Sequence, residues 1–119
     1  MTDAAQIAQR YIDSWNETDA TRRADLLTAL WTEDARYVDP MMAGEGRGQI
    51  DALIAGVHQQ FPGFRFALSG KPDGYGDKVR FSWILGPAGG EGLVEGTDFG
   101  VVENGRLRAV TGFLDKVPA

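Results

Sequence analysis

The sequence predicts a single α+β domain in which helices pack on one face of an antiparallel sheet. In the first half of the chain, apolar residues recur every three or four positions, as in amphipathic helices. After residue 63 they alternate with polar residues, which is the period of a strand. Helices followed by strands is the order of an α+β domain. The 119 residues are the length of one domain, so we expect residues 1–119 to form one.

The first helix is predicted over residues 3–16, with Ile7, Tyr11 and Trp15 on its apolar face. Thr2 or Asp3 can cap its N-terminus. A second helix follows a cap at Thr18 or Asp19 and extends through Trp31, and residues 32–34 are expected to form a fresh cap and one short turn.

A short strand is predicted over residues 36–39, and Pro40 ends it because proline cannot donate to a ladder. Residues 43–48 are rich in glycine and are expected to form a loop. A third helix then places Ile50, Leu53, Ile54 and Val57 on one face, before Pro62-Gly63 stops it.

Four strands are predicted in the second half. They begin at residue 64, at about residue 79, at residue 93 and at residue 107, and turn-forming segments at 72–76, 86–92 and 104–105 separate them. Asn104-Gly105 is the strongest hairpin signal in the chain. If the 86–92 loop turns at Gly89-Gly90, Asp98 lies opposite Phe81 and Gly96 lies opposite Trp83.

The register of the last strand stays open at this stage. A plain two-residue turn at residues 104–105 would direct Leu107, Ala109, Thr111 and Phe113 inward with Asp98. A bulge would instead direct Val110, Gly112 and Leu114 inward.

Composition excludes several functions. There is no cysteine and one histidine, His58, so disulfides, thiol nucleophiles and histidine-pair metal sites are excluded within one chain, and we expect no metal or other cofactor. The net charge is −5 and the basic residues are scattered, which argues against nucleic-acid binding. No apolar run approaches the roughly 20 residues that cross a bilayer, and residues 1–10 have no apolar h-region, so we expect no secretory signal. We therefore expect a cytoplasmic protein.

Asp98 is the most informative residue. It lies in the middle of a predicted strand, where aspartate is depleted, and Gly96 and Gly100 leave room over its face. With Phe81 and Trp83 on the neighbouring strand, an apolar wall would surround the carboxyl, and burial would raise its pKa enough to make a neutral proton donor. An outward, solvated aspartate is the competing interpretation.

Other candidates are less specific. Asp39 precedes Pro40, which either starts a turn or, with the soft Met41-Met42 pair, forms the lip of a binding site. Tyr11 fits a core position with a bonded hydroxyl. His58 lies near the end of the third helix, where pairing with the last carbonyls is the simpler role and catalysis the less favoured one.

The order of these elements resembles the NTF2-like superfamily, in particular its SnoaL-like polyketide cyclases and its ketosteroid-isomerase-like branch. The resemblance spans Tyr11 to Asp115. Five short segments carry it: Arg10-Tyr11-Ile12-Asp13, Trp31-Thr32-Glu33-Asp34-Ala35, Tyr37-Val38-Asp39-Pro40, Gly48-Gln49-Ile50, and Gly105-Arg106 through Gly112-Phe113. It implies a cone of curved antiparallel sheet wrapped by three helices, an apolar pocket at the open end, and a homodimer.

In ketosteroid isomerases a helix-one tyrosine and a protonated late-strand aspartic acid bind an oxyanion, and an aspartate before proline moves the proton. By resemblance those roles fall to Tyr11, Asp98 and Asp39. This division of roles is also the one that general accounts of isomerase catalysis describe for a relative. The turn before Gly105 looks one residue shorter than in those isomerases. We expect the pocket wall to include Trp15, Met41, Val57, Phe61, Phe81, Trp83 and Gly96, with His58 as a further candidate.

The predicted function is therefore proton transfer, by an isomerase or an aldol-type cyclase, on an apolar carbonyl compound through a stabilised enolate. A non-catalytic module that binds a small ligand or a partner on the same fold is the first alternative. An epoxide hydrolase is the second, and it would need Arg80 to face inward between two acids. A homodimer is expected through an outer sheet face carrying Phe99 and Val101, with Leu107 or Val110 as further contributors.

Overall fold

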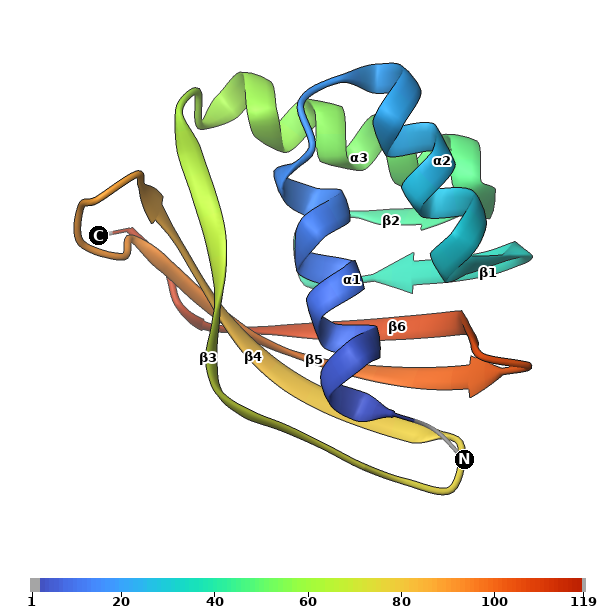
Figure 1. The fold of residues 1–119 in the computed structure, drawn as a ribbon. Helices are drawn as coiled ribbons and strands as arrows, with labels where there is room; N and C mark the ends of the chain where they lie inside the picture. The colour runs from blue at the N-terminus through green and yellow to red at the C-terminus, as the bar shows by residue number, and fades with distance from the viewer. Residues whose placement is uncertain (1–2, 119) are drawn as a thin grey trace.

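The computed structural model describes residues 3–118, in which three helices cover one face of a curved six-stranded sheet (Figure 1). The helices are α1 (Ala4–Asn16), α2 (Ala20–Leu30) and α3 (Gly46–Gln60). The strands are β1 (Trp31–Val38), β2 (Ala43–Glu45), β3 (Phe64–Tyr75), β4 (Lys78–Pro87), β5 (Val94–Glu103) and β6 (Arg106–Lys116). The predicted α+β class is confirmed.

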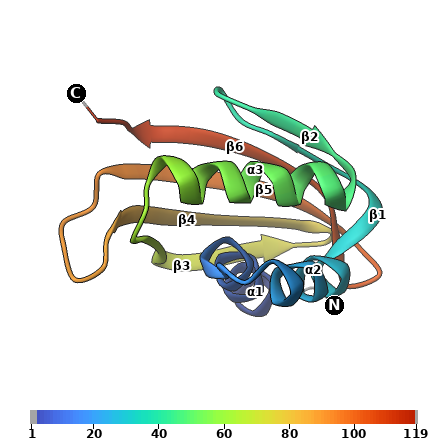
Figure 2. The same ribbon diagram turned by 90° about the horizontal axis from the view of Figure 1, so that it is seen from above.

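The strands lie in the order β2-β1-β6-β5-β4-β3. All neighbouring pairs are antiparallel, as the fold class predicts, except β1 and β6, which run parallel. A parallel pair needs a long crossover, and here α3 together with β3 to β5 supplies it. Seen from above, α3 runs lengthwise over the sheet while α1 lies on the β3 side (Figure 2).

The helix caps follow the sequence closely. The side chain of Asp3 accepts a hydrogen bond from the Gln6 amide, and the side chain of Asp19 accepts one from the Arg22 amide. Each satisfies a backbone donor that the first turn leaves unpaired. Of the two capping residues considered for the second helix, the structure uses Asp19.

The predictions for residues 31–34 and 43–48 are wrong. Trp31 begins β1 instead of ending α2, and residues 32–34 continue the strand instead of forming a turn. Residues 43–45 form β2, which pairs with β1 from Arg36 opposite Glu45 to Val38 opposite Ala43. β1 is held by β6, a partner distant in the sequence, so local periodicity carries no signal for that pairing, and β2 has only three residues, too few for a period to show. Residues 72–75 of the predicted 72–76 turn instead continue strand β3, with a register shift between Ser69 and Asp73, and the turn itself lies at residues 76–77.

The predicted register between β4 and β5 is confirmed. Phe81 lies opposite Asp98, and Trp83 lies opposite Gly96. Alternate residues of β4 are buried, so the face that carries Phe81 and Trp83 turns toward the helices. Asp98 is on that inner face of the sheet and is not the solvated residue of the competing interpretation.

The hairpin between β5 and β6 resolves the open register of the last strand. Asn104 and Gly105 both have positive φ, 52° and 79°, as a type I′ turn requires. The register then shifts between Val101 and Val102, which is a β-bulge on β6 around residue 108. Beyond the bulge, Val110 and Gly112 face inward, as the bulge alternative predicts.

Leu107, before the bulge, also faces inward. Leu107 is 0% and Val110 1% exposed, so the expectation that either contributes to the outer face is wrong. One extra residue changes which side of the sheet the following side chains occupy, and this places both residues in the core.

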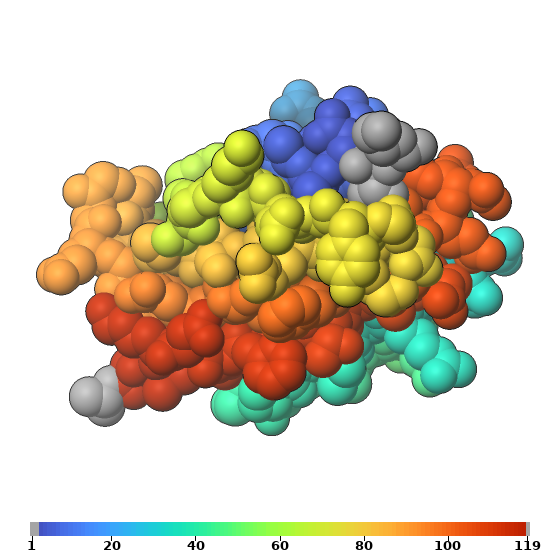
Figure 3. Space-filling model, turned by 90° about the horizontal axis from the view of Figure 1, so that it is seen from below, coloured from blue at the N-terminus to red at the C-terminus, as the bar shows by residue number. Residues whose placement is uncertain are grey.

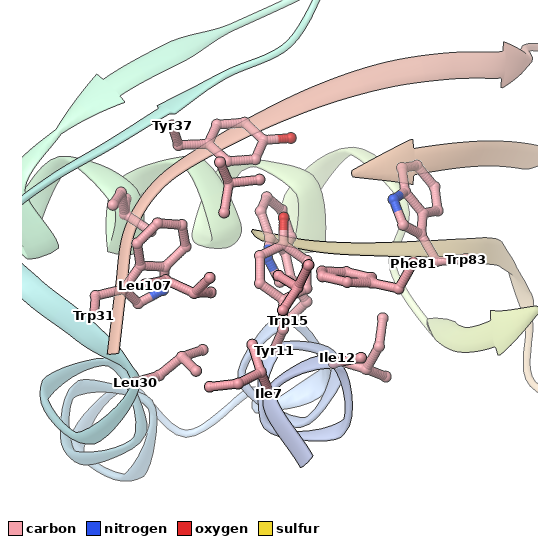
Figure 4. Packing of buried hydrophobic residues seen from close by; sticks show 14 of the residues in the cluster. Ile7, Tyr11, Ile12, Trp15, Leu30, Trp31, Tyr37, Phe81, Trp83 and Leu107 are labelled. Carbon is pink, nitrogen blue, oxygen red and sulfur yellow. The ribbon is translucent and has the colours of Figure 1, made fainter. Parts of the chain in front are cut away.

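The core lies between the helices and the inner face of the sheet (Figure 4). Rings from α1, β1 and β4 meet there, with Tyr11 edge-on to Phe81 at 4.9 Å between ring centroids. Two hydrogen bonds connect the end of α1 to β3. The backbone amide of Phe66 donates to Oδ1 of Asn16 at 2.7 Å, and Nδ2 of Asn16 donates to the Phe66 carbonyl oxygen at 2.9 Å. This double hydrogen bond sets the position of the α1 residues that line the site.

Candidate active site

A cavity of about 400 Å³ opens between α1, α3 and the inner face of the sheet. Its wall is almost entirely apolar and aromatic. The lining residues are Tyr11, Trp15, Tyr37, Asp39, Met41, Met42, Val57, Gln60, Phe61, Phe66, Trp83, Leu85, Val94, Asp98, Leu114, Val117 and Pro118. An apolar cavity with a few convergent polar groups is the usual form of a small-molecule site.

The structure brings together the three residues to which the resemblance gives catalytic roles: Tyr11, Asp39 and Asp98 all line this cavity. Five of the expected wall residues do so as well, namely Trp15, Met41, Val57, Phe61 and Trp83.

The remaining three expected residues lie outside the wall. The Phe81 ring is buried beneath Tyr11, against which it packs. Gly96 is covered by the indole of Trp83, because a β-carbon at residue 96 would lie 2.3 Å from that ring. His58 faces α1 instead, and its Nε2 lies 2.6 Å from the carbonyl oxygen of Trp15. That contact ties α3 to the last turn of α1, which is a structural role.

Asp98 is buried at the floor of the cavity, with 1% of its surface exposed. Its Oδ1 has no hydrogen-bond partner among the described residues. Burial raises the pKa of Asp98 from 3.8 to about 6, while the nearby Tyr11 hydroxyl and Trp83 indole oppose the rise and the charge of Asp39 adds to it. A buried carboxyl oxygen without a partner is costly, and such groups gather at functional sites.

Tyr11 enters the cavity from the buried face of α1, one helical turn before Trp15. Burial is the main reason that the pKa of Tyr11 is raised, and the charge of Asp98 adds to it. The phenol therefore stays protonated and is available as a hydrogen-bond donor beside Asp98.

Asp39 lies at the mouth, in the turn after β1, and is held in a fixed orientation. Its Oδ1 accepts hydrogen bonds from the backbone amides of Met41 and Met42, at 2.7 and 2.9 Å. Its Oδ2 accepts a 2.6 Å hydrogen bond from the hydroxyl of Tyr37. The two acids thus have contrasting surroundings, since Asp39 has three donors while Oδ1 of Asp98 has none.

The acids approach each other over Gly112 of β6. A β-carbon at this position would lie 2.8 Å from Oδ1 of Asp98, 3.2 Å from Cβ of Asp39 and 3.5 Å from the Tyr37 hydroxyl. Only a residue without a side chain fits under this cluster. The bulge in β6 directs this glycine inward.

Tyr37 is the main site residue that sequence reasoning missed. It precedes Asp39 by two positions, and residues two apart on a strand share a face, so the signal was present. Its ring lies 5.7 Å from Trp15, and its hydroxyl is visible in Figure 4. Other lining residues, among them Gln60, Val94 and Pro118, come from segments with no local pattern that places them at a cavity.

Arg80 faces away from the cavity, where it pairs with Asp73 at 3.3 Å on the outer face of the sheet. The inward arginine that the epoxide-hydrolase interpretation requires is therefore not supplied by Arg80. Within residues 3–118, no cluster of three or more histidine, aspartate or glutamate side chains is arranged to hold a metal ion. No helix in this part of the chain is long and apolar enough to cross a membrane.

Comparison with known proteins places this arrangement in a family. The model of the SnoaL-like domain matches residues 8–110, which is most of the chain. A search of curated proteins finds no match.

Solved structures agree with the family match. A candidate isomerase of the SnoaL-like family from Agrobacterium tumefaciens is 47% identical, with a TM-score of 0.91 over 97% of this chain and 99% of that chain. A candidate ketosteroid isomerase from Kribbella flavida is 24% identical, with a TM-score of 0.72 over 98% of this chain and 80% of that one.

A hypothetical protein with a ketosteroid-isomerase-like fold from Catenulispora acidiphila, solved in complex with trimethylamine, is 16% identical, with a TM-score of 0.74 over 92% of this chain and 85% of that one. These last two likenesses, each under 25% identity, concern the fold alone. The family match and the 47% identical relative together establish that this chain belongs to the SnoaL-like family, on an NTF2-like fold.

Proposed function

We propose that this protein is a proton-transfer enzyme, an isomerase or an aldol-type cyclase, that acts on an apolar carbonyl compound through an enolate. The observation that carries the proposal is the buried Asp98 carboxyl, with an unpartnered Oδ1 beside the Tyr11 hydroxyl at the floor of an apolar cavity. A buried carboxyl oxygen without a hydrogen bond destabilises the folded protein unless a bound ligand forms a hydrogen bond with it.

In the proposed reaction, Asp39 in its carboxylate form takes a proton from the carbon next to the substrate carbonyl. The electron pair of that C–H bond forms the C=C bond of the enolate, and the negative charge moves to the oxygen. Tyr11 and the protonated form of Asp98 donate hydrogen bonds to that oxygen. In an isomerisation, Asp39 then returns the proton to a different carbon. In a cyclisation, the enolate carbon forms a C–C bond to a second carbonyl carbon, and the oxygen of that carbonyl takes up the proton from Asp39 to give a hydroxyl group.

The raised pKa of Asp98, about 6, supports a second assignment of roles within the same reaction class. A carboxyl that titrates near neutral pH is well suited to carry the proton itself. Both oxygens of Asp39 accept hydrogen bonds, from Tyr37, Met41 and Met42, whereas Oδ1 of Asp98 has no partner among the described residues, and this contrast supports the second assignment. The Tyr11 hydroxyl would then be the donor to the enolate oxygen, because the Tyr37 hydroxyl already donates to Asp39. The two assignments predict opposite pH profiles.

A non-catalytic module that binds a small ligand remains the alternative function. The complex of the Catenulispora acidiphila protein with trimethylamine supports ligand binding on this fold without implying turnover. Proton exchange separates the two functions, because a binding module would hold a carbonyl compound without accelerating the exchange of its α-protons.

The test follows deuterium exchange by NMR at the α-carbon of a panel of cyclic enones, with wild-type protein and the Asp39→Asn, Asp98→Asn and Tyr11→Phe variants. We expect catalysed exchange that each variant lowers by about 10²-fold or more. Exchange that rises as pH increases through about 6 supports Asp98 as the proton carrier, and exchange that falls supports it as the neutral donor. No catalysed exchange with any enone, together with ligand binding, would replace the proposal by the binding module.

We further propose that the protein forms a homodimer through the outer face of the sheet (Figure 3). Phe99 and Phe113 are 43% and 53% exposed there and pack edge to face at 5.7 Å. A hollow of about 360 Å³ adjoins them, with Tyr75 and Val101 among its lining residues. Exposed aromatic side chains gathered beside a hollow are typical of an interface.

A further inference from the structure

The charges around the cavity do not balance. Asp39 and Asp98 line it, and none of the other described lining residues is a lysine, arginine or histidine. The described arginines and lysines with acidic partners pair elsewhere: Arg23 with Asp51 between α2 and α3, and the others on the surface. When Asp98 is ionised, its charge is therefore buried without a counter-ion among residues 3–118.

Both oxygens of Asp39 accept hydrogen bonds, so the acid whose charge is uncompensated is Asp98. Oδ1 of Asp98 is buried and has no hydrogen-bond partner in the described part of the chain, although the side chain faces the cavity. A buried charge without a partner strongly favours any cation that can approach it, because the attraction is strong in a site with little water.

Aromatic rings surround the space next to Asp98. Trp15 is the centre of the group, with ring centroids 6.0 Å from Tyr11, 5.7 Å from Tyr37 and 5.4 Å from Phe66. Phe66 lies 5.3 Å from Trp83, which completes an aromatic wall contributed by α1, β1, β3 and β4. Aromatic faces attract cations, and indole rings do so most strongly.

We propose that this cavity binds a compact alkylammonium group, with Asp98 as its counter-ion and the rings of Tyr11, Trp15, Tyr37, Phe66 and Trp83 as its cage. The inference goes beyond the proposed function, because it requires the cavity and its charge but no turnover. It adds a ligand class, amines that carry apolar substituents on nitrogen, to the carbonyl compounds proposed above.

The chemistry of the wall selects this kind of cation. A metal ion needs several oxygen ligands, but the wall offers few polar groups and the oxygens of Asp39 are occupied. A guanidinium group has five N–H donors, most of which would lose their hydrogen bonds here. Trialkyl and tetraalkyl ammonium groups present carbon on their surface, so an apolar and aromatic wall solvates them well.

The test compares choline with its neutral isostere, 3,3-dimethyl-1-butanol, which has the same shape without the charge. Binding to the full chain at pH 8 is followed by tryptophan fluorescence, because Trp15 and Trp83 line the cavity. We expect choline to bind at least roughly tenfold more tightly than the isostere, which corresponds to about 1.4 kcal/mol.

Asp98→Asn should weaken choline binding by roughly tenfold or more and leave the isostere unaffected, and the latter result would also show that the cavity is intact. Trp83→Leu should weaken choline more than the isostere. Asp25→Asn is the matched control, since it removes an exposed acid of α2 outside the cavity, and it should change neither affinity.

Equal affinity for choline and its isostere, no measurable choline binding, or full choline binding by Asp98→Asn would each overturn the inference. Failure here is distinguishable from failure of the proposed function. Enones that exchange their protons without choline binding would leave the enzyme proposal standing, and choline binding without any exchange would leave only the ammonium site.

Discussion

The hydroxyl of Tyr37 donates a 2.6 Å hydrogen bond to Oδ2 of Asp39, the acid at the mouth of the cavity. With the Met41 and Met42 amides on Oδ1, this bond fixes the plane of the carboxyl group. Tyr37 thereby acts as a positioning residue, and its own pKa is raised, mainly by burial and then by the charge of Asp98.

Tyr37→Phe should therefore lower proton exchange by about tenfold, because the ring stays while the hydrogen bond that orients Asp39 is lost. The effect should appear mainly in kcat, with a small change in KM, and this can be measured with any enone that shows exchange. Tyr75→Phe is the control, since that tyrosine is exposed on the outer face. Equal rates for Tyr37→Phe and wild type would mean that Asp39 needs no such support.

The second prediction concerns the stability cost of Asp98. Its pKa is raised from 3.8 to about 6 by burial, so between these values the folded state binds more protons than the unfolded state. Stability from this group is therefore highest at low pH and falls as pH rises from about 4 through about 6, by about 2–3 kcal/mol in all.

Asp98→Asn should abolish the fall in stability that the ionisation of Asp98 causes as pH rises. We expect the variant to be more stable than wild type at pH 8 by about 2 kcal/mol, with a difference that shrinks toward pH 4, as measured by urea unfolding. Asp25→Asn, an exposed acid in α2, should show no such trend. If the variant were less stable than wild type at pH 8, burial of the Asp98 charge would not destabilise the protein, and the prediction would be wrong.

Gly112 supplies the third prediction. An alanine β-carbon would lie 2.8 Å from Oδ1 of Asp98, so Gly112→Ala should displace the carboxyl and weaken ligand binding by about tenfold or more, with the far-UV circular dichroism retained. Gly56→Ala is the matched control, because it adds the same methyl in open space on α3. It should leave binding unchanged and stabilise the protein by about 0.5–1 kcal/mol. Unimpaired binding by Gly112→Ala would separate Asp98 from the ligand site.

The fourth prediction concerns assembly. If the outer sheet face joins two copies, size-exclusion chromatography with light scattering at micromolar concentration should give a dimer. Phe99→Glu should convert it to a folded monomer, because two carboxylates would be buried in the interface. Leu93→Glu, in the loop before β5, should remain dimeric. A monomeric wild type at that concentration would refute the dimer.

Much of the fold could be predicted from local pattern. The caps at Asp3 and Asp19, the Asn104-Gly105 turn and the register that places Asp98 opposite Phe81 all depend on residues close in the sequence. Strand β1 could not be predicted over its full length, because its parallel partner β6 is joined to it by most of the chain. The three-residue β2 is too short for any period to show.

The site residues also include some that the sequence could predict and some that it could not. Asp98 could be selected from its mid-strand position beside Gly96 and Gly100, and the resemblance added the roles of Tyr11 and Asp39. Period two could have added Tyr37. Gly96 was assigned to the pocket wall because glycine leaves space, but the neighbouring Trp83 occupies that space. Which side chain fills a gap depends on rotamers across strands, and a sequence pattern does not contain them.

The central claim is that Asp98 and Tyr11 form a donor pair for an oxyanion at the floor of the cavity. The most direct test is a fluorescence titration with equilenin, a phenol that mimics an enolate, at pH 5, where Asp98 is mainly protonated. The account predicts micromolar binding that Asp98→Ala and Tyr11→Phe each weaken by about tenfold or more. Absence of binding, or binding that neither substitution changes, would contradict it.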